Sequence, residues 1–365
     1  MAGLSCGIVG LPNVGKSTLF NALTRKSAPA ANYPFCTIDP NVGIVEVPDP
    51  RLEALSLISN SKKIVPATVT FVDIAGLVRG ASEGEGLGNK FLANIRETDA
   101  IILMVRCFED ENIVHVAGKI DPIADIEVIH LELILSDLQM IDNILKKVEK
   151  QAKGKKEFET LLGVLKQAAA HLNTNQPLRT LELTPEERLE LAAYPFLTDK
   201  KVIYVANVSE SALPSMDNEY VQMVRSYAKK EGSPVICLSA QLEHELSTLD
   251  PQDAKAFLQE MGLEDTGLNR LIKTAFDTLG LITYMTTGEV ETRAWTIHKG
   301  QTAQEAAGKI HTDIERGFIR AEVVAFKDFI DHEGRAGARE VGKARSEGKE
   351  YIVQDGDVIL FFHNP

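Results

Sequence analysis

The chain has 365 residues, of which 44% are hydrophobic and 25% charged, and its formal net charge is −13. This composition is typical of a globular protein with two or three domains, and it excludes fibrous and intrinsically disordered proteins. An acidic chain does not coat nucleic acid with its whole surface, because phosphate contacts require local positive charge. We therefore expect any RNA contact to come from basic patches.

The cysteine spacing and the hydropathy indicate a cellular compartment. Cys6, Cys36, Cys107 and Cys237 are too widely spaced for a metal site or a dense disulfide framework, which favours a reducing environment. The first residues lack the basic segment of a signal peptide, and no run approaches the ~18 apolar residues of a membrane span. We expect a cytoplasmic monomer without a membrane partner.

Residues 10–17 read Gly-Leu-Pro-Asn-Val-Gly-Lys-Ser and fit the phosphate-binding pattern G-x-x-x-x-G-K-[ST]. They lie between an apolar run at 6–9, expected to be a strand, and a helical pattern at 18–23. In such loops backbone N–H groups surround phosphate oxygens, the lysine charge faces the β- and γ-phosphates, and the serine hydroxyl binds Mg²⁺. The chain is therefore predicted to bind a nucleoside triphosphate. The expected contacts are Asn13, Val14, Gly15, Lys16, Ser17 and Thr18, with Ser17 also a metal ligand.

Further along the chain, apolar runs alternate with helical patterns. The runs at 69–73, 100–105, 202–206 and 235–238 are rich in valine and isoleucine and are separated by helical segments. Near-continuous apolar strands of this kind are typical of a mostly parallel sheet covered by helices on both faces. We predict an α/β nucleotide-binding domain over residues 1–278.

An insertion over residues 127–200 interrupts this domain with a different pattern. Apolar residues alternate spacings of three and four on either side of Gly154, which predicts an antiparallel helical hairpin with coiled-coil packing. Thr184 to Glu187 then forms the sequence signature of a capping box for one more helix. The expected seam of the hairpin consists of Leu131, Ile134, Leu138, Ile141, Leu145, Val148 and Ala152 on one helix and Phe158, Leu162, Leu165, Ala169 and Leu172 on the other.

Two dense basic segments stand out in this acidic chain. The first is the hairpin tip, and the second is Arg335, Arg339, Lys343, Arg345 and Lys349 near the C-terminus. Both are candidate contacts with RNA phosphates, and the alternative for the tip is a solvated helix face, where lysine is common. The tip carries Lys146, Lys147, Lys150, Lys153, Lys155 and Lys156.

The C-terminal residues 281–364 are expected to form a small, separate α+β domain. Short strand patterns occur at 294–297, 321–325 and 358–362, around one helix near 303–310.

Two more segments fit a nucleotide-dependent switch. Asp73-Ile74-Ala75-Gly76 follows a predicted strand and matches the D-x-x-G element, whose aspartate orients the magnesium shell and whose glycine N–H reaches the γ-phosphate. Thr37 lies between this element and the phosphate-binding loop, where its hydroxyl can complete the magnesium sphere. Mg²⁺ is thus the expected cofactor, with Ser17 and Thr37 as its ligands.

These motifs, with Asn-Tyr-Pro-Phe-Cys-Thr at 32–37, the glycine-rich 80–88 and Arg-Ala-Trp-Thr-Ile at 293–297, resemble the YchF group of Obg-like ATPases. The resemblance covers the whole chain. It implies a P-loop domain of the Obg type, a C-terminal TGS domain of the ubiquitin-like β-grasp fold, and binding to the ribosome, for which we expect the large subunit and its rRNA.

The predicted base-binding segment departs from a guanine-reading site. Such a site has Asn/Thr-Lys-x-Asp, whereas this chain has Asn207-Val208-Ser209-Glu210. A site that loses its matched acceptor loses discrimination of roughly 10⁴-fold, so ATP is the expected nucleotide. The resemblance implies that Asn207 and the Val208 backbone contact adenine, with Glu210 and Ser239 nearby.

The residue that positions the attacking water is less evident. Leu77 follows Gly76 where many related switches have a glutamine, and a leucine cannot orient water. The resemblance assigns this role to His115, although a lone loop histidine is commonly only solvated. Asn13 stands where related potassium-dependent P-loop proteins hold a monovalent cation, which adds K⁺ as a second candidate cofactor.

The sequence leaves three functions open. The first is a slow nucleotide-hydrolysing switch, either an ATPase or a GTPase of relaxed base specificity, and the second is an ATP-binding module with negligible hydrolysis. The third is a small-molecule kinase, which the paired switch elements disfavour.

Overall fold

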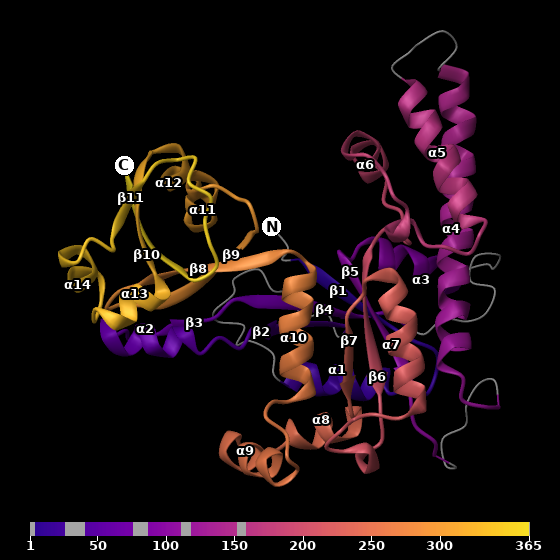
Figure 1. Ribbon diagram of the computed structural model, residues 1–365, viewed down its shortest axis with the longest axis horizontal. Helices are drawn as coiled ribbons and strands as arrows, with labels where there is room; N and C mark the ends of the chain where they lie inside the picture. The colour runs from indigo at the N-terminus through magenta and orange to yellow at the C-terminus, as the bar shows by residue number, and fades with distance from the viewer. Residues whose placement is uncertain (1–3, 26–40, 76–86, 111–117, 152–157, 365) are drawn as a thin grey trace.

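Two six-stranded sheets organise the molecule, with a helical hairpin projecting from the first (Figure 1). The computed structural model describes residues 4–25, 41–75, 87–110, 118–151 and 158–364. Among these, no helix is long and apolar enough to cross a membrane.

The first sheet has the strand order β2-β4-β1-β5-β6-β7. All neighbours are parallel except β2, which pairs antiparallel with β4. The predicted parallel sheet is therefore confirmed, and the sequence analysis missed only its antiparallel edge strand. The strands are β1 (Ser5–Val9), β2 (Val42–Glu46), β4 (Thr68–Asp73), β5 (Ala100–Arg106), β6 (Lys201–Asn207) and β7 (Val235–Leu238).

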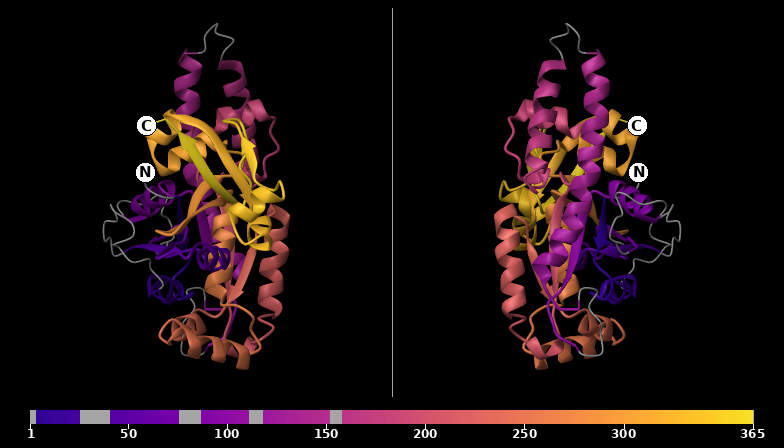
Figure 2. Two further views of the ribbon diagram at one scale, coloured as in Figure 1. Left: turned by 90° about the vertical axis from the view of Figure 1, so that its left-hand side faces the viewer. Right: turned by 90° about the vertical axis from the view of Figure 1, so that its right-hand side faces the viewer.

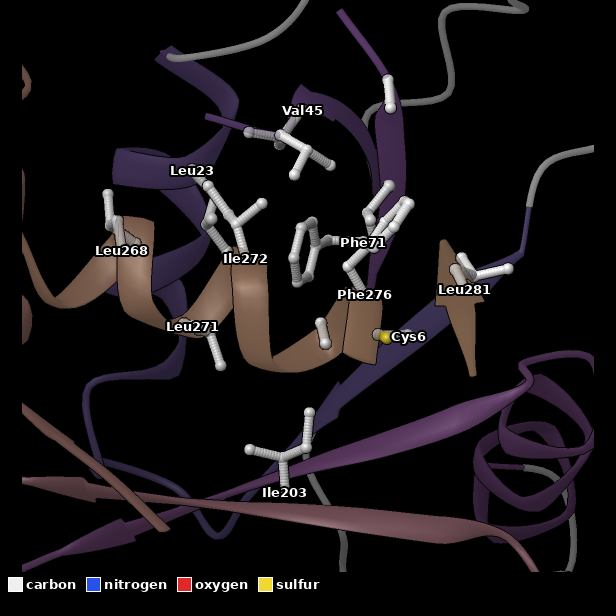
Figure 3. Close-up of a cluster of buried hydrophobic side chains, with 14 of the residues drawn as sticks. Cys6, Leu23, Val45, Phe71, Ile203, Leu268, Leu271, Ile272, Phe276 and Leu281 are labelled. Atoms are coloured by element: carbon white, nitrogen blue, oxygen red, sulfur yellow. The ribbon is translucent and has the colours of Figure 1, made fainter. Parts of the chain in front are cut away.

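Helices cover both faces of this sheet, as the apolar strands require. On one face, α1 (Lys16–Arg25) and α10 (Gly267–Thr278) pack through a core that includes Phe71 of β4 (Figure 3). On the other face lie α3 (Leu87–Arg96), the first turns of α4 (Pro122–Gln151) and α7 (Glu219–Glu231). At the same end as the phosphate-binding loop lie η4 (Glu210–Ala212), α8 (Ala240–Leu246) and α9 (Pro251–Glu260).

The predicted hairpin consists of α4 and α5 (Glu159–Leu172), which extend away from the sheet (Figure 2). Ile134, Ile141 and Val148 of α4 are buried against α5, as expected. Leu131 was also expected in the seam, and this prediction is wrong, because Leu131 is 45% exposed. It lies in the stretch where α4 packs on the sheet through Ile126, Ile129 and Leu133, so the seam begins after it.

The chain returns from the hairpin through η3 (Leu178–Thr180) and α6 (Pro185–Ala192). The capping box at Thr184 and Glu187 is confirmed, with the Glu187 N–H donating to Thr184 Oγ1 at 3.2 Å. Buried Asp137 of α4 accepts hydrogen bonds from the Leu197 and Thr198 N–H groups at 2.9 and 2.8 Å. These bonds attach the hairpin to the strand that follows.

The second sheet has the order β11-β10-β12-β8-β9-β3 and combines parallel and antiparallel pairs. Five strands come from the C-terminal residues, and the helix expected near 303–310 is α11 (Ala303–Ile310). The elements are β3 (Ile64–Val65), β8 (Leu281–Thr287), β9 (Thr292–His298), β10 (Phe318–Ala325), β11 (Arg345–Glu347), β12 (Asp357–His363), α12 (Thr312–Arg316), α13 (Phe326–Asp331) and α14 (Arg335–Glu340).

The sixth strand of this sheet, β3, comes from the N-terminal part of the chain. Ile64 and Val65 pair in parallel with Thr292 and Arg293 of β9. The neighbouring α2 (Arg51–Ser59) packs on the same sheet, as seen in Figure 1. The two sheets are therefore connected by strand pairing as well as by the chain itself.

A polar cluster reinforces this junction. The Arg51 guanidinium donates to Asp49 Oδ2 and to Asp355 Oδ2, both at 2.8 Å, and to Thr283 Oγ1 at 3.1 Å. Arg51 thus bonds residues on both sides of the junction.

Candidate nucleotide-binding site

The loop between β1 and α1 has the backbone that phosphate binding requires. Asn13 and Gly15 have φ values of 64° and 97°, in the left-handed region. A Cβ atom on Gly15 would lie 2.5 Å from Asn207 Nδ2, and one on Gly10 would lie 2.9 Å from the Met104 carbonyl oxygen. Both positions therefore require glycine. The close approach of Met104 was not predicted from the sequence.

Asn207 connects this loop to the start of α8. Its Nδ2 donates to the Val14 carbonyl at 2.9 Å, and its Oδ1 accepts from the Ala240 N–H at 2.9 Å. The residue is only 3% exposed. Its amide thus bonds two backbone groups and holds the phosphate-binding loop against the start of α8, and its contact with the base stays a prediction.

The two nucleotide motifs meet in space. Lys16 Nζ forms an ion pair and hydrogen bond with Asp73 Oδ1, and both side chains are mostly buried. Ser17 is exposed on the first turn of α1, and Thr18 beside it is half-buried. Because the helix N-terminus favours anions, this arrangement combines a phosphate site with the oxygen ligands that Mg²⁺ prefers.

The donor set fits magnesium better than a transition metal. No group of three or more histidine, cysteine, aspartate or glutamate side chains gathers within the described part of the chain. The Ser17 hydroxyl and the Asp73 carboxylate are hard oxygen donors, and magnesium commonly takes few protein ligands together with substrate phosphates.

The predicted base-binding segment lies beyond β6. Val208 is buried and its N–H donates to the Leu238 carbonyl at 2.9 Å. Glu210 is exposed at the start of η4. Ser239 is buried and caps α8, with its hydroxyl accepting from the Leu242 N–H at 3.3 Å. Val208 therefore packs in the hydrophobic core at the position where a guanine site has a lysine.

Arg106 is a structural residue of the site that the sequence analysis missed. It ends β5 and is only 1% exposed. Its guanidinium donates to the carbonyls of Phe108 and Asp110 at 3.1 and 3.2 Å and lies 4.8 Å from the Phe108 ring centre. It thereby fixes the segment that leads toward His115. An arginine at the end of an otherwise apolar run was the available signal.

Four of the predicted functional residues lie outside the described part of the chain. These are Thr37, Gly76 and His115, together with Cys36, whose oxidation we expect to affect the switch. Leu77, Gly154 and the tip residues Ala152, Lys153, Lys155 and Lys156 also lie outside it. Their assignments stay predictions.

The two basic segments differ once their acidic partners are visible. Lys147 and Lys150 are exposed and form no ion pair with any described residue, whereas Lys146 pairs with Asp142. In the C-terminal segment all five cations lie within 4.0 Å of a carboxylate. Glu322 alone binds both Arg335 and Arg339. The C-terminal segment is therefore a much weaker phosphate-binding candidate than its sequence indicates.

The parallel sheet, the glycine-dependent loop and the Lys16–Asp73 pair define a P-loop nucleotide-binding protein of the GTPase type. Family comparison agrees. Residues 5–156 match MMR_HSR1, described as a 50S ribosome-binding GTPase, and residues 281–364 match YchF-GTPase_C, described as a protein of unknown function (DUF933).

Whole-chain comparison identifies the family. The chain is 53% identical to the ribosome-binding ATPase YchF of Escherichia coli O157:H7 over 363 residues, and 53% identical to that of Bacillus subtilis over 367 residues. Each alignment covers 99% of both chains. The YchF GTPase of Schizosaccharomyces pombe superposes with a TM-score of 0.89 at 36% identity, over 99% of this chain and 98% of that one. The chain belongs to the YchF family, as its motifs predicted.

Proposed function

We propose that this protein is a ribosome-binding ATPase that acts as a nucleotide-dependent switch. The observation that carries the proposal is the Lys16–Asp73 contact beside a loop that only glycine can form. This arrangement joins a phosphate-binding motif to a switch motif at the carboxyl ends of the parallel strands β1 and β4. The names of the full-length relatives support both the ATPase activity and the ribosome as a partner.

ATP is the proposed substrate in preference to GTP. A guanine site needs a carboxylate that accepts two hydrogen bonds and a lysine stem beside the base, and Glu210 and Val208 replace both. Calorimetric titration of the nucleotide-free protein with each nucleotide tests this. We expect tighter binding of ATP, and a Glu210→Asp variant should gain affinity for GTP relative to ATP. Equal or tighter binding of GTP by the unaltered chain would refute the preference.

Each residue has a defined role in hydrolysis. Lys16 and the loop N–H groups hold the β- and γ-phosphates, and the N-terminus of α1 adds its positive dipole end. Ser17 and Thr37 would hold Mg²⁺, with Asp73 orienting its shell, and the ion would supply positive charge to the phosphates. Gly76 would bind the γ-phosphate through its N–H. His115 would accept a proton from the attacking water, a role that Leu77 cannot fill.

The hydrolytic role of His115 is separable from binding. His115→Ala should slow phosphate release in a single-turnover assay and leave ATP affinity within about twofold, since the residue is not a phosphate ligand. Unchanged turnover of His115→Ala would mean that another group positions the attacking water. Negligible phosphate release from the unaltered protein, with and without ribosomes, would favour an ATP-binding module.

The same proposal extends to the ribosomal subunit that is bound, the oligomeric state and the monovalent cation. We infer that the large ribosomal subunit is the docking partner, through rRNA phosphates, and that the protein acts as a cytoplasmic monomer. Potassium activation through Asn13 is a further element, and replacing K⁺ by Na⁺ at constant ionic strength in the phosphate-release assay tests it.

A further inference from the structure

A cavity lies at the root of the hairpin, away from the phosphate-binding loop. Its volume is about 560 Å³, within the range of small-molecule sites. The walls come from α4, from the end of α7 and from the turn at residues 175–177. None of the residues assigned above to nucleotide binding lines it.

Glu231 supplies a hydrogen-bond acceptor to this cavity. Its Oε2 accepts from Arg179 Nε and Nη2 at 3.0 and 2.8 Å and from the Tyr204 hydroxyl at 2.9 Å. Its Oε1 forms no hydrogen bond within the described residues and lies 3.8 Å from His130 Nδ1. The side chain is 6% exposed and lines the cavity. Glu231 thus lines the cavity with one carboxylate oxygen that has no hydrogen-bond partner among the described residues.

Tyr227 supplies a hydrogen-bond donor next to Glu231. Burial, and then the Arg179 charge, hold the pKa of His130 well below its ordinary value and so favour the neutral imidazole. Its Nε2 lies 3.1 Å from Arg179 Nη2, which can only donate, so the proton resides on Nδ1 and is donated to the Tyr227 hydroxyl at 3.1 Å. The hydroxyl proton of Tyr227 is then free to donate. Tyr227 and Glu231 are one turn apart on α7 and both line the cavity.

The remaining walls combine apolar side chains with the polar residues Glu127, Asn175 and Gln176, and one cation lies at the rim. Val128, Leu131 and Ile134 of α4 face Pro177 across the cavity. Leu131, which lies outside the hairpin seam and is 45% exposed, lines this cavity. Lys230 is exposed at the rim and forms no ion pair with any described residue.

We propose that this cavity binds a nucleobase, carried by a free nucleotide or by an unpaired RNA residue. Every nucleobase presents an N–H donor next to an acceptor, which matches Glu231 Oε1 next to the Tyr227 hydroxyl. The apolar side chains of Leu131 and Pro177 suit the faces of a planar ring, and Lys230 provides the charge for an attached phosphate. The proposal is independent of the phosphate-binding loop.

The experiment uses the full chain with its phosphate-binding loop saturated by a non-hydrolysable ATP analogue. The four nucleoside 5′-monophosphates and four short single-stranded homo-oligoribonucleotides are titrated by calorimetry. We expect saturable binding of at least one probe. For adenine, purine riboside 5′-monophosphate, which lacks the exocyclic amino group, should bind about tenfold more weakly than AMP, since it loses its donor to Glu231. Binding of monophosphates identifies a free nucleotide, whereas binding of oligomers alone identifies RNA.

Matched variants locate the binding. Tyr227→Phe and Leu131→Ala should each weaken it by about five- to tenfold, because each removes one contact and leaves the fold intact. Tyr220→Phe on the same helix and Leu135→Ala on α4, both outside the cavity, should leave it unchanged. Absence of saturable binding by all probes, or full binding by the Tyr227→Phe/Leu131→Ala double variant, would overturn the proposal.

Discussion

Two regions of this molecule hold cations against carboxylates, and the consequences differ. In the phosphate-binding loop, Lys16 contacts Asp73 at the open end of the sheet, beside loop N–H groups and a helix N-terminus. In the second sheet, Glu322 of β10 binds Arg335 and Arg339 together. The first cation belongs to an anion-binding surface, whereas the other two hold α14 on β10. The density of cations in a sequence therefore does not measure the charge that is free to bind a ligand.

Replacing glycine should have the largest effect on the first region. Gly15→Ala places a Cβ 2.5 Å from Asn207 Nδ2 at a φ of 97°, so we expect a loss of about 2 to 5 kcal/mol, from backbone strain and overpacking together, and no measurable ATP binding. Gly163→Ala is the matched control. It lies in α5 with open space around it, and should stabilise the protein by about 0.5 to 1 kcal/mol. Thermal unfolding and calorimetry measure both. Wild-type ATP affinity in Gly15→Ala would contradict the loop geometry.

Removing the cation of the first region should weaken binding and spare the fold. Lys16→Ala should cost about 1.5 to 3 kcal/mol of ATP binding, the range for a hydrogen bond to a charged group. Titration with ATP and Mg²⁺ measures this loss. Unchanged affinity would refute the phosphate-binding role of Lys16.

Removing a cation from the second region should lower the stability of the protein and leave its ligand binding unchanged. Arg335→Ala should lower the free energy of unfolding by about 1.5 to 3 kcal/mol, because a mostly buried charge-assisted hydrogen bond to Glu322 is lost. Ribosome affinity should change little. Denaturant unfolding and ribosome sedimentation together test this. A variant of normal stability that no longer sediments with ribosomes would restore the C-terminal segment as an RNA contact.

The exposed hairpin lysines provide the comparison for ribosome binding. Lys147→Gln with Lys150→Gln should lower the slope of log affinity against log salt by about 1.4 to 1.8, if both contact phosphates. ATP affinity should stay the same. Lys255→Gln, on α9 at the opposite end of the molecule in Figure 1, is the control. Sedimentation across a salt series measures the slope. A double variant with the wild-type slope would exclude these two lysines.

The smallest effect concerns pH. Hydrogen bonds from Arg339, and then from Arg335, hold the pKa of Glu322 below its ordinary value, against the effect of burial. The stability that this carboxylate contributes is therefore complete above the unfolded pKa of about 4.3 and is lost as the pH falls from there through the lower native pKa. Melting temperatures of the wild type and Glu322→Gln should converge over that window. Melting temperatures that differ by the same amount across this pH range would contradict the stabilising role of the Glu322 carboxylate.

Local geometry decided which features could be predicted from the sequence. The loop at 10–17, β1, the strands of the parallel sheet and the capping box at Thr184 each depend on residues close together in the chain, and each was predicted. The second sheet was predicted only in part. Its strand β3 is two residues long, too short for any periodic pattern, and its partner lies more than 200 residues away.

The site was predictable to a similar extent. The pattern at 10–17 predicted the phosphate-binding loop, whose left-handed Asn13 and Gly15 are present, but the bonds of the Asn207 amide to Val14 and Ala240 were not predicted. Such bonds depend on how two loops meet, which no local pattern encodes. The pairing of Arg335 with Glu322 was likewise hidden, since strand β10 and helix α14 come together only in the folded sheet.

The pairing of β3 with β9 also has a consequence for synthesis. Ile64 and Val65 leave the ribosome more than 200 residues before Thr292 and Arg293, with which they pair. Domains generally fold from the N-terminus as the chain emerges, at about 5 to 20 residues per second. The β3 segment and the face of α2 that packs on the second sheet must therefore wait roughly ten seconds or more for their partners. During that interval the nascent chain exposes an unpaired strand edge, so this junction can form only after the C-terminal strands have been synthesised.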